Sequence, residues 1–133
     1  MAIKPLSQEL LDSFVPVDNQ AAAFDSFKSL MTSVTEAGQP WPPHIGIFGQ
    51  HYIVGLLPYG RGWQSFSFFG KGIKAAHLPE IIKTVNNYVG LRKWGKIMHC
   101  VENCDQRMCR FIELMGFKKL KPHKGHFLYY REC

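Results

Sequence analysis

Hydrophobic residues recur at helical spacing in four segments of this chain, which places them along one side of each predicted helix. Ser7 and Asp18 directly precede the first two segments and are predicted to cap them, and Pro79 suits the first turn of the third. The apolar stripes are Leu10, Leu11 and Phe14; Phe24, Phe27, Leu30, Met31 and Val34; Leu78, Ile81, Ile82, Val85, Tyr88 and Val89; and Met108, Phe111, Ile112 and Met115. We expect these helices to end near Pro16, Gly38, Gly90 and Gly116.

Shorter apolar runs, separated by glycine, proline and polar residues, indicate β-strands. They cover residues 2–6, 44–48, 51–57, 63–69, 96–101, 117–120 and 126–132. Residues 49–50 predict a tight hairpin, and residues 57–62 predict a turn.

The order of these elements predicts an α/β fold with a mixed sheet, in a single domain of residues 1–133. The chain passes from strand 63–69 through a helix to strand 96–101, which implies that these two strands are parallel. Alternation along WQSFSFF places Phe66 and Phe68 on one face of the strand and Ser65 and Ser67 on the other.

Composition excludes a disordered chain, because 46% of the residues are hydrophobic and 14% are aromatic. The sequence contains no apolar run of membrane-spanning length and begins without the pattern of a signal peptide, so we expect a cytoplasmic protein. The formal charge of +6 favours an anionic partner, such as a phosphorylated cofactor, an acidic protein surface or a nucleic acid. Nucleic acid is the least favoured of these, because the lysines of FKKLKPHKGH lack interleaved aromatic residues and no helix carries a basic stripe.

Three of the four cysteines lie in HCVENCDQRMC, which raises the question of a zinc site with His99 as a further ligand. The spacing argues against it, because His99 and Cys100 would point to opposite faces of a strand. Cys104 and Cys109 are five residues apart and would not share a helix face. We predict no metal site and no disulfide, and expect the cysteines to be small buried hydrophobic residues.

The segment VENCDQRMCRFIELMGF resembles the GNAT superfamily of N-acetyltransferases, whose late segment runs strand, Asn, helix, Gly-Phe. Here these are KIMHCV, Asn103, the helix at 104–115 and Gly116-Phe117. The short chain, the GIFGQHYIVG hairpin and the W-x-x-F strand are most similar to small GNAT-like proteins of T7-type bacteriophages, which include an internal virion protein. The resemblance implies a central sheet of about six or seven strands and about four helices. It also implies that the two parallel strands in the middle splay apart.

In this family the splay and the loop after the middle strand hold acetyl-CoA as co-substrate. Backbone N–H groups near a helix N-terminus favour an anion, and glycine lets the chain approach phosphate closely. Carried over, the resemblance implies that the cofactor contacts Phe68, Phe69, Gly70, Lys71, Gly72, Lys74 and Asn103. Two features depart from the pattern: Ser67 stands at the usual Gln or Arg position, and the following helix begins late, near Pro79.

The family's usual acid groups are absent, because WQSFSFF contains no carboxylate and Ile112 stands at the position of a common tyrosine. Amine acetylation needs a neutral amine and a proton donor to the departing thiolate. The weak catalytic candidates are His99, Glu102 and Tyr130, where alternation sends either Tyr129 or Tyr130 inward. The acceptor side could include His44, His51 and Tyr59. Arg61 could bind an acidic acceptor, but we expect it to be a solvated side chain.

Two functions therefore stay open. One is a GNAT-type N-acetyltransferase, or an acetyl-CoA-binding protein, that acts on an amine of a protein or small molecule. The other is a catalytically silent GNAT-fold phage protein, which would bind and redirect a host protein in the host cytoplasm or serve as a virion component.

Overall fold

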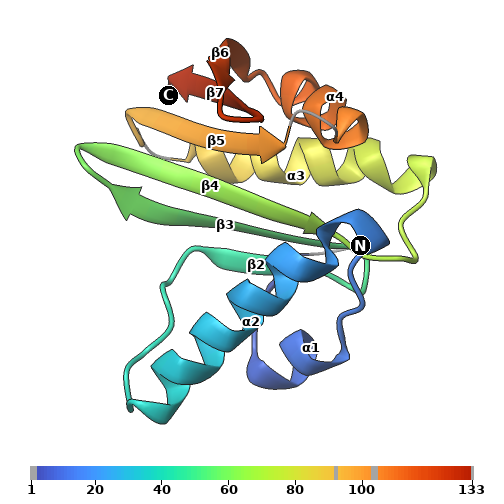
Figure 1. The fold of residues 1–133 in the computed structure, drawn as a ribbon, viewed down its shortest axis with the longest axis vertical. Coiled ribbons are helices and arrows are strands. Elements are labelled where there is room, and N and C mark those ends of the chain that lie inside the picture. The colour runs from blue at the N-terminus through green and yellow to red at the C-terminus, as the bar shows by residue number, and fades with distance from the viewer. Residues whose placement is uncertain (1–2, 92, 103–104, 133) are drawn as a thin grey trace. The chain divides into compact units, whose positions relative to one another are not determined.

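The computed structural model describes residues 3–91, 93–102 and 105–132. These residues form four α-helices and one sheet of seven strands (Figure 1). The helices are α1 (Gln8–Ser13), α2 (Ala21–Glu36), α3 (Leu78–Gly90) and α4 (Gln106–Leu114). The strands are β1 (Ile3–Pro5), β2 (Ile45–Phe48), β3 (Tyr52–Tyr59), β4 (Gly62–Phe69), β5 (Lys96–Glu102), β6 (Lys118–His123) and β7 (His126–Glu132). The predicted α/β class and the predicted order of elements are confirmed.

The sheet is mixed, with strand order β1-β2-β3-β4-β5-β7-β6. The β4–β5 pair is parallel, as predicted, whereas β1–β2, β2–β3, β5–β7 and β6–β7 are antiparallel. Parallel pairing joins Trp63–Ser65 to Ile97–His99, although β4 continues to Phe69 and β5 to Glu102. Among the described residues, the two strands are therefore paired over only part of their lengths.

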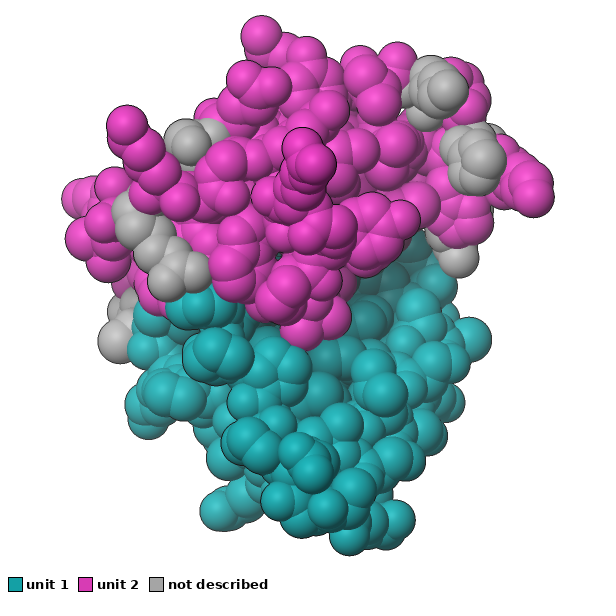
Figure 2. All heavy atoms as spheres, turned by 90° about the vertical axis from the view of Figure 1, so that its left-hand side faces the viewer, with its two compact units in different colours: residues 1–55, 67–75 teal, residues 56–66, 76–133 magenta. Residues whose placement is uncertain are grey.

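The chain divides into two compact units, which are coloured separately in Figure 2. Unit 1 comprises residues 1–55 and 67–75, and unit 2 comprises residues 56–66 and 76–133. Strands β3 and β4 contribute residues to both units. The single domain of residues 1–133 stays a prediction.

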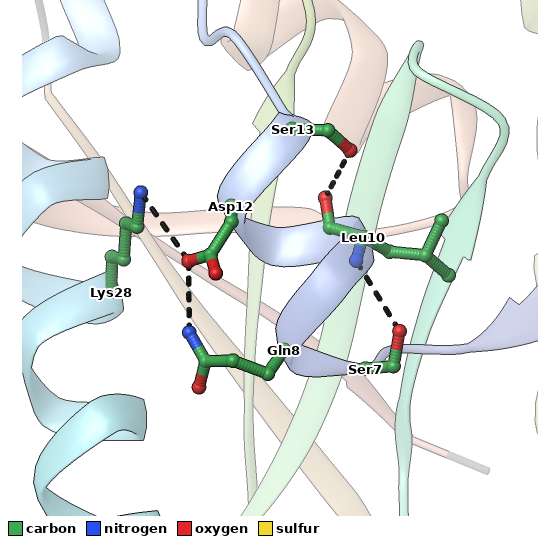
Figure 3. Close-up of polar contacts among 6 residues, drawn as sticks. All are labelled: Ser7, Gln8, Leu10, Asp12, Ser13 and Lys28. Atoms are coloured by element: carbon green, nitrogen blue, oxygen red, sulfur yellow. Dashed lines mark hydrogen bonds and ion pairs between the residues drawn. The ribbon is translucent and has the colours of Figure 1, made fainter.

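Helix α1 in unit 1 begins at its predicted cap (Figure 3). The Ser7 hydroxyl accepts a hydrogen bond from the Leu10 amide at 3.3 Å, which satisfies one of the amides that a helix start leaves free. The Asp12 carboxylate accepts from the side-chain amide of Gln8 in the same helix at 2.9 Å. It also lies 3.5 Å from the Lys28 ammonium, which joins α1 to α2.

The start of α2 differs from the prediction. Asp18 does not cap it: Asp18–Gln20 form a short 3₁₀ helix, and α2 begins at Ala21 without a side-chain cap. Asp18 instead forms an ion pair with Lys71 at 3.0 Å. The buried Gln20 side chain accepts a hydrogen bond from the Phe69 amide at 2.7 Å, so both polar residues connect this segment to the end of β4.

The core of unit 1 gathers around Phe24 on α2. Its ring lies 5.1 Å from that of Phe14 and 5.4 Å from that of Phe68. Met31 is also buried, but the side chain of Leu30 is 58% exposed, so its placement in the apolar stripe was wrong. Successive residues of an α-helix are about 100° apart, and Leu30 falls beside the stripe that Phe24 and Met31 define.

The turn predicted at residues 57–62 is shorter in the structure. Strand β3 runs to Tyr59 and β4 begins at Gly62, which leaves Gly60 and Arg61 between them. Gly60 has a φ of 57°, a conformation that glycine adopts without steric cost and that suits a two-residue hairpin.

In unit 2, side chains of β7 contact α4 and the residue that ends it. Asp105 caps α4 by accepting from the Met108 amide at 3.1 Å. Tyr129 of β7 is fully buried, and its hydroxyl donates to Glu113 of α4 at 2.9 Å. Arg131 donates to the Met115 carbonyl at 2.8 Å and to Asn86 of α3, so one guanidinium joins both helices to β7.

The cysteines follow the prediction only in part. Cys109 is buried on α4, whereas Cys100 is exposed, because it points away from the buried face of β5 that carries His99. Cys104 and Cys133 lie outside the described residues. In the segments that the structure describes, no helix has the length and hydropathy of a membrane span, and no cluster of three possible metal-binding side chains occurs.

Candidate functional site

The loop after β4, residues 70–74, belongs to unit 1 and is tied to it by backbone hydrogen bonds. The Gly70 amide donates to the His51 carbonyl at 2.8 Å, and the Lys71 amide donates to the Val15 carbonyl at 2.9 Å. The Ile73 amide donates back to the Gly70 carbonyl at 3.0 Å. Three amides that a phosphate-binding loop would offer to an anion are therefore already bonded within the protein.

The two glycines of this loop have different surroundings. A Cβ atom on Gly70 would lie 2.0 Å from the Gln50 carbonyl oxygen, so only glycine fits where these two backbones meet. A Cβ atom on Gly72 would meet no atom closer than 3.5 Å, at the His51 ring. Gly70 is thus explained by packing alone, whereas Gly72 is exposed and a Cβ atom there would make only ordinary contact with the His51 ring.

Two exposed lysines supply positive charge to the loop. The Lys71 ammonium lies 3.0 Å from the Asp18 carboxylate, and both side chains are largely exposed to solvent. An exposed ion pair contributes little to stability, so Lys71 can exchange Asp18 for another anion at small cost. Lys74 is also exposed, two residues beyond Gly72.

The preceding residues of β4 are buried in unit 1. The Phe68 ring packs against Phe24, and the Phe69 ring lies 5.7 Å from that of Tyr52. The Phe69 amide is bonded to Gln20, and its carbonyl accepts from the Val17 amide at 2.9 Å. The described contacts of Phe68 and Phe69 thus belong to the core, and the cofactor contacts predicted for them stay predictions.

Strand β5 in unit 2 brings His99 against Ser65 of β4, its partner in the parallel register. The Ser65 hydroxyl oxygen lies 2.6 Å from His99 Nδ1 and 3.3 Å from the Met98 carbonyl oxygen. His99 is only 4% exposed, and burial lowers its pKa to about 4, because the imidazolium would lose its hydration. His99 is therefore neutral near pH 7.

The other catalytic candidates are not grouped with His99. Its partner on β7 is Tyr129, the inward member of the tyrosine pair, so Tyr130 lies on the opposite face of the strand. Tyr130 is half-buried, with the Lys96 ammonium 5.3 Å from its ring centre. The side chain of Glu102 and the whole of Asn103 lie outside the described residues.

The predicted acceptor-side residues are scattered. His44 and His51 are half-buried in unit 1, and the His51 carbonyl supports the loop through Gly70. Tyr59 and Arg61 are exposed in unit 2.

Ile112 is the residue that the sequence resemblance sets against a common tyrosine. It is 1% exposed on the apolar face of α4, between Met108 and Met115, which are also buried. A hydrocarbon side chain cannot donate a proton, so α4 offers packing at this position and no acid.

Solved structures with a similar fold include acetyltransferases. They include the N-acetyltransferase PseH of Campylobacter jejuni in complex with acetyl coenzyme A, at 8% identity and a TM-score of 0.63 over 98% of this chain and 99% of that chain. A GNAT-family acetyltransferase from Bacillus anthracis matches at 9% identity and a TM-score of 0.65, over 98% of this chain and 93% of that chain. This chain has the GNAT fold. A third GNAT-fold relative, the ribosomal-protein-alanine N-acetyltransferase of Brucella melitensis, matches at 6% identity and 0.58 over the whole of both chains.

At the level of sequence, no protein-family model and no curated protein matches this chain. The likeness to these solved structures therefore lies in the fold, whereas few residues are identical. The Ser65–His99 contact was missed from the sequence, because alternation gave the face of each residue but nothing fixed which residues of the two strands are opposite.

The buried His99 predicts a fall in stability as the pH is lowered. Its pKa is lower in the folded protein than the unperturbed value, so the unfolded chain binds the proton first. The stabilisation is complete above about pH 6.5 and is lost towards pH 4, with a total of about 3 kcal/mol. Urea unfolding should show that the free energy of unfolding falls less between about pH 7 and about pH 4.5 for His99→Gln than for the unmodified protein. An equal fall in both proteins would contradict the assignment of this acid-dependent instability to His99.

Proposed function

We propose that this protein binds acetyl-CoA at the loop of residues 70–74 and transfers the acetyl group to an amine of a protein or small molecule. The observation that carries the proposal is the GNAT fold across nearly the whole chain, with an exposed glycine and two exposed lysines after β4. PseH, with the same fold, was crystallised with acetyl coenzyme A, which supports the same ligand here.

Lys71, Gly72 and Lys74 are the residues of the loop best suited to the cofactor. Gly72 is exposed and carries no side chain to keep a phosphate group from the backbone, and the two ammonium groups offer charge-assisted hydrogen bonds. The bonded amides of Gly70 and Lys71 are less suited, because a phosphate would have to displace their carbonyl partners. Binding of this kind depends on side-chain charge more than on a cradle of backbone amides.

Calorimetric titration with acetyl-CoA tests the binding step. We expect measurable heat with the unmodified protein and a loss of affinity of about tenfold for Lys74→Glu, because one charged contact is replaced by repulsion. Lys83→Glu, at an exposed position of α3, makes the same charge change and should leave the affinity unaltered. The absence of heat at millimolar acetyl-CoA with folded protein would reject the proposal.

The second candidate is a catalytically silent protein on the same fold. The buried Ile112 and the absence of a carboxylate from β4 favour it, because both usual sources of acid chemistry are missing. In the phage setting that the sequence resemblance suggests, such a protein would bind a host protein or form part of the virion.

An acetyl-transfer assay separates the two candidates. Incubation with acetyl-CoA and amine acceptors, including peptides and polyamines, should release free CoA thiol together with acetylated product if transfer occurs. Binding of acetyl-CoA without product, combined with capture of a specific protein partner, would favour the silent protein.

A further inference from the structure

The excess positive charge of the chain lies in unit 2. This unit contains twelve of the 16 lysine and arginine residues and five of the ten acidic residues, so its formal charge is +7, whereas that of unit 1 is −1. Its exposed lysines include Lys118 and Lys119 on β6 and Lys124 in the turn before β7. A charge distribution of this kind attracts a polyanion to unit 2.

One face of the strands β5, β7 and β6 brings lysine side chains beside a tyrosine. Met98, Tyr130 and Lys118 are partners across these three neighbouring strands, so their side chains form a row on the same face. Gln64 of β4 extends the row on the other side of Met98. The Lys96 ammonium lies 5.3 Å from the centre of the Tyr130 ring. Tyr130 therefore has one lysine over its ring and a second lysine opposite it on β6.

This face of β7 is turned away from helices α3 and α4. Arg131, the residue after Tyr130, donates to Asn86 of α3 and to the Met115 carbonyl that follows α4. Alternation along a strand places Tyr130 on the opposite side. Lys96 and Lys118 are exposed, and Tyr130 is half-buried. The tyrosine thus offers part of its ring to solvent between two mobile positive charges.

We infer that the row formed by Lys96, Tyr130 and Lys118 binds single-stranded nucleic acid. The two ammonium groups contact phosphates, and the Tyr130 ring stacks on a base. A cation–π contact at an exposed site is weak, so Lys96 can leave the ring for a phosphate at small cost. This surface belongs to unit 2 alone, and its role does not depend on the proposed binding of acetyl-CoA by unit 1.

Strand pairing removes the objection that the sequence raised against a nucleic acid. The lysines of FKKLKPHKGH have no interleaved aromatic residue, but β7 supplies the ring of Tyr130 directly opposite Lys118. An acidic protein segment needs only the positive charges, whereas an unpaired base also uses the exposed part of an aromatic ring. A duplex keeps its base faces stacked inside, so the ring favours a single strand over both alternatives.

Fluorescence anisotropy with a labelled single strand of about 12 nucleotides tests the phosphate contacts. We expect the affinity to fall as salt rises, and the slope of log K against log salt to become shallower by about 0.7 in Lys96→Ala and in Lys118→Ala. Lys83→Ala removes the same charge from an exposed position of α3 and should leave the slope unaltered. A slope that is the same in the unmodified protein and in both row variants would overturn the inference.

The stacking contact has a test of its own. Tyr130→Ala should weaken binding of the single strand by about tenfold, whereas Tyr130→Phe keeps the ring and should bind within about twofold of the unmodified protein. Glu132 is the exposed partner of Lys96 on β7, so Glu132→Gln should strengthen binding. Circular dichroism checks the fold of each variant, and the lysine variants test the surface independently of Tyr130→Ala.

Two competing polyanions identify the partner. A duplex of the same sequence and an oligoglutamate peptide of the same charge should each bind more weakly than the single strand to the unmodified protein. Equal or tighter binding of the duplex, or of the acidic peptide, would overturn the assignment to single-stranded nucleic acid. Neither outcome bears on calorimetric binding of acetyl-CoA, which is measured separately.

Discussion

Gly70→Ala should destabilise the protein by about 3 kcal/mol, the upper range for overpacking a rigid site. The added Cβ atom would lie 2.0 Å from the Gln50 carbonyl oxygen, so the backbones of two segments must separate. The Gly70 amide would then lose its hydrogen bond to His51. Urea unfolding followed by circular dichroism measures the change.

Gly72→Ala is the matched control, two residues along the same loop. Its Cβ atom has ordinary contacts, so we expect stability within about 0.5 kcal/mol of the unmodified protein. The same variant should weaken acetyl-CoA binding if phosphate approaches the chain there. Equal destabilisation by the two substitutions would show that the packing at Gly70 is not the decisive difference.

Phe111→Ala in α4 should lower the free energy of unfolding by about 3–5 kcal/mol, the usual cost of emptying a buried aromatic site. Its side chain is 2% exposed, among Met108, Ile112 and Met115 on the inner face of the helix. Thermal and urea unfolding give the magnitude, provided that the transition remains two-state.

Leu114→Ala controls for the loss of a large apolar residue from the same helix. Leu114 is 65% exposed, so little apolar surface returns to water and the expected change is within about 0.5 kcal/mol. A comparable loss in both variants would mean that the periodicity of α4 does not define its buried face.

The sequence predicted the elements well where a single physical rule governs them. The stripe of α4 and the cap at Ser7 were correct, because helical periodicity and a free helix start each demand particular residues. The cap at Asp18 was wrong for a tertiary reason. Its carboxylate pairs with Lys71, a residue far along the chain, which local pattern cannot reveal.

The candidate site was less predictable than the fold. The pattern Gly-Lys-Gly indicated a phosphate loop, yet Gly70 is required by the backbone of Gln50, whose proximity depends on the folded chain. The Ser65–His99 contact depends on the register of two strands joined by a long connection. Alternation gives the face that a residue occupies, and only the assembled sheet gives its neighbour.

The outermost strands of the sheet have a consequence for association between copies of the protein. An unpaired strand edge is a template for edge-to-edge aggregation unless it is short, irregular or charged. Strand β1 has three residues and ends in Pro5. Strand β6 carries Lys118 and Lys119, contains Pro122 and shifts register between Lys119 and Lys121. Both borders thus discourage the addition of a further strand, which helps a chain rich in apolar residues to remain dispersed at high concentration.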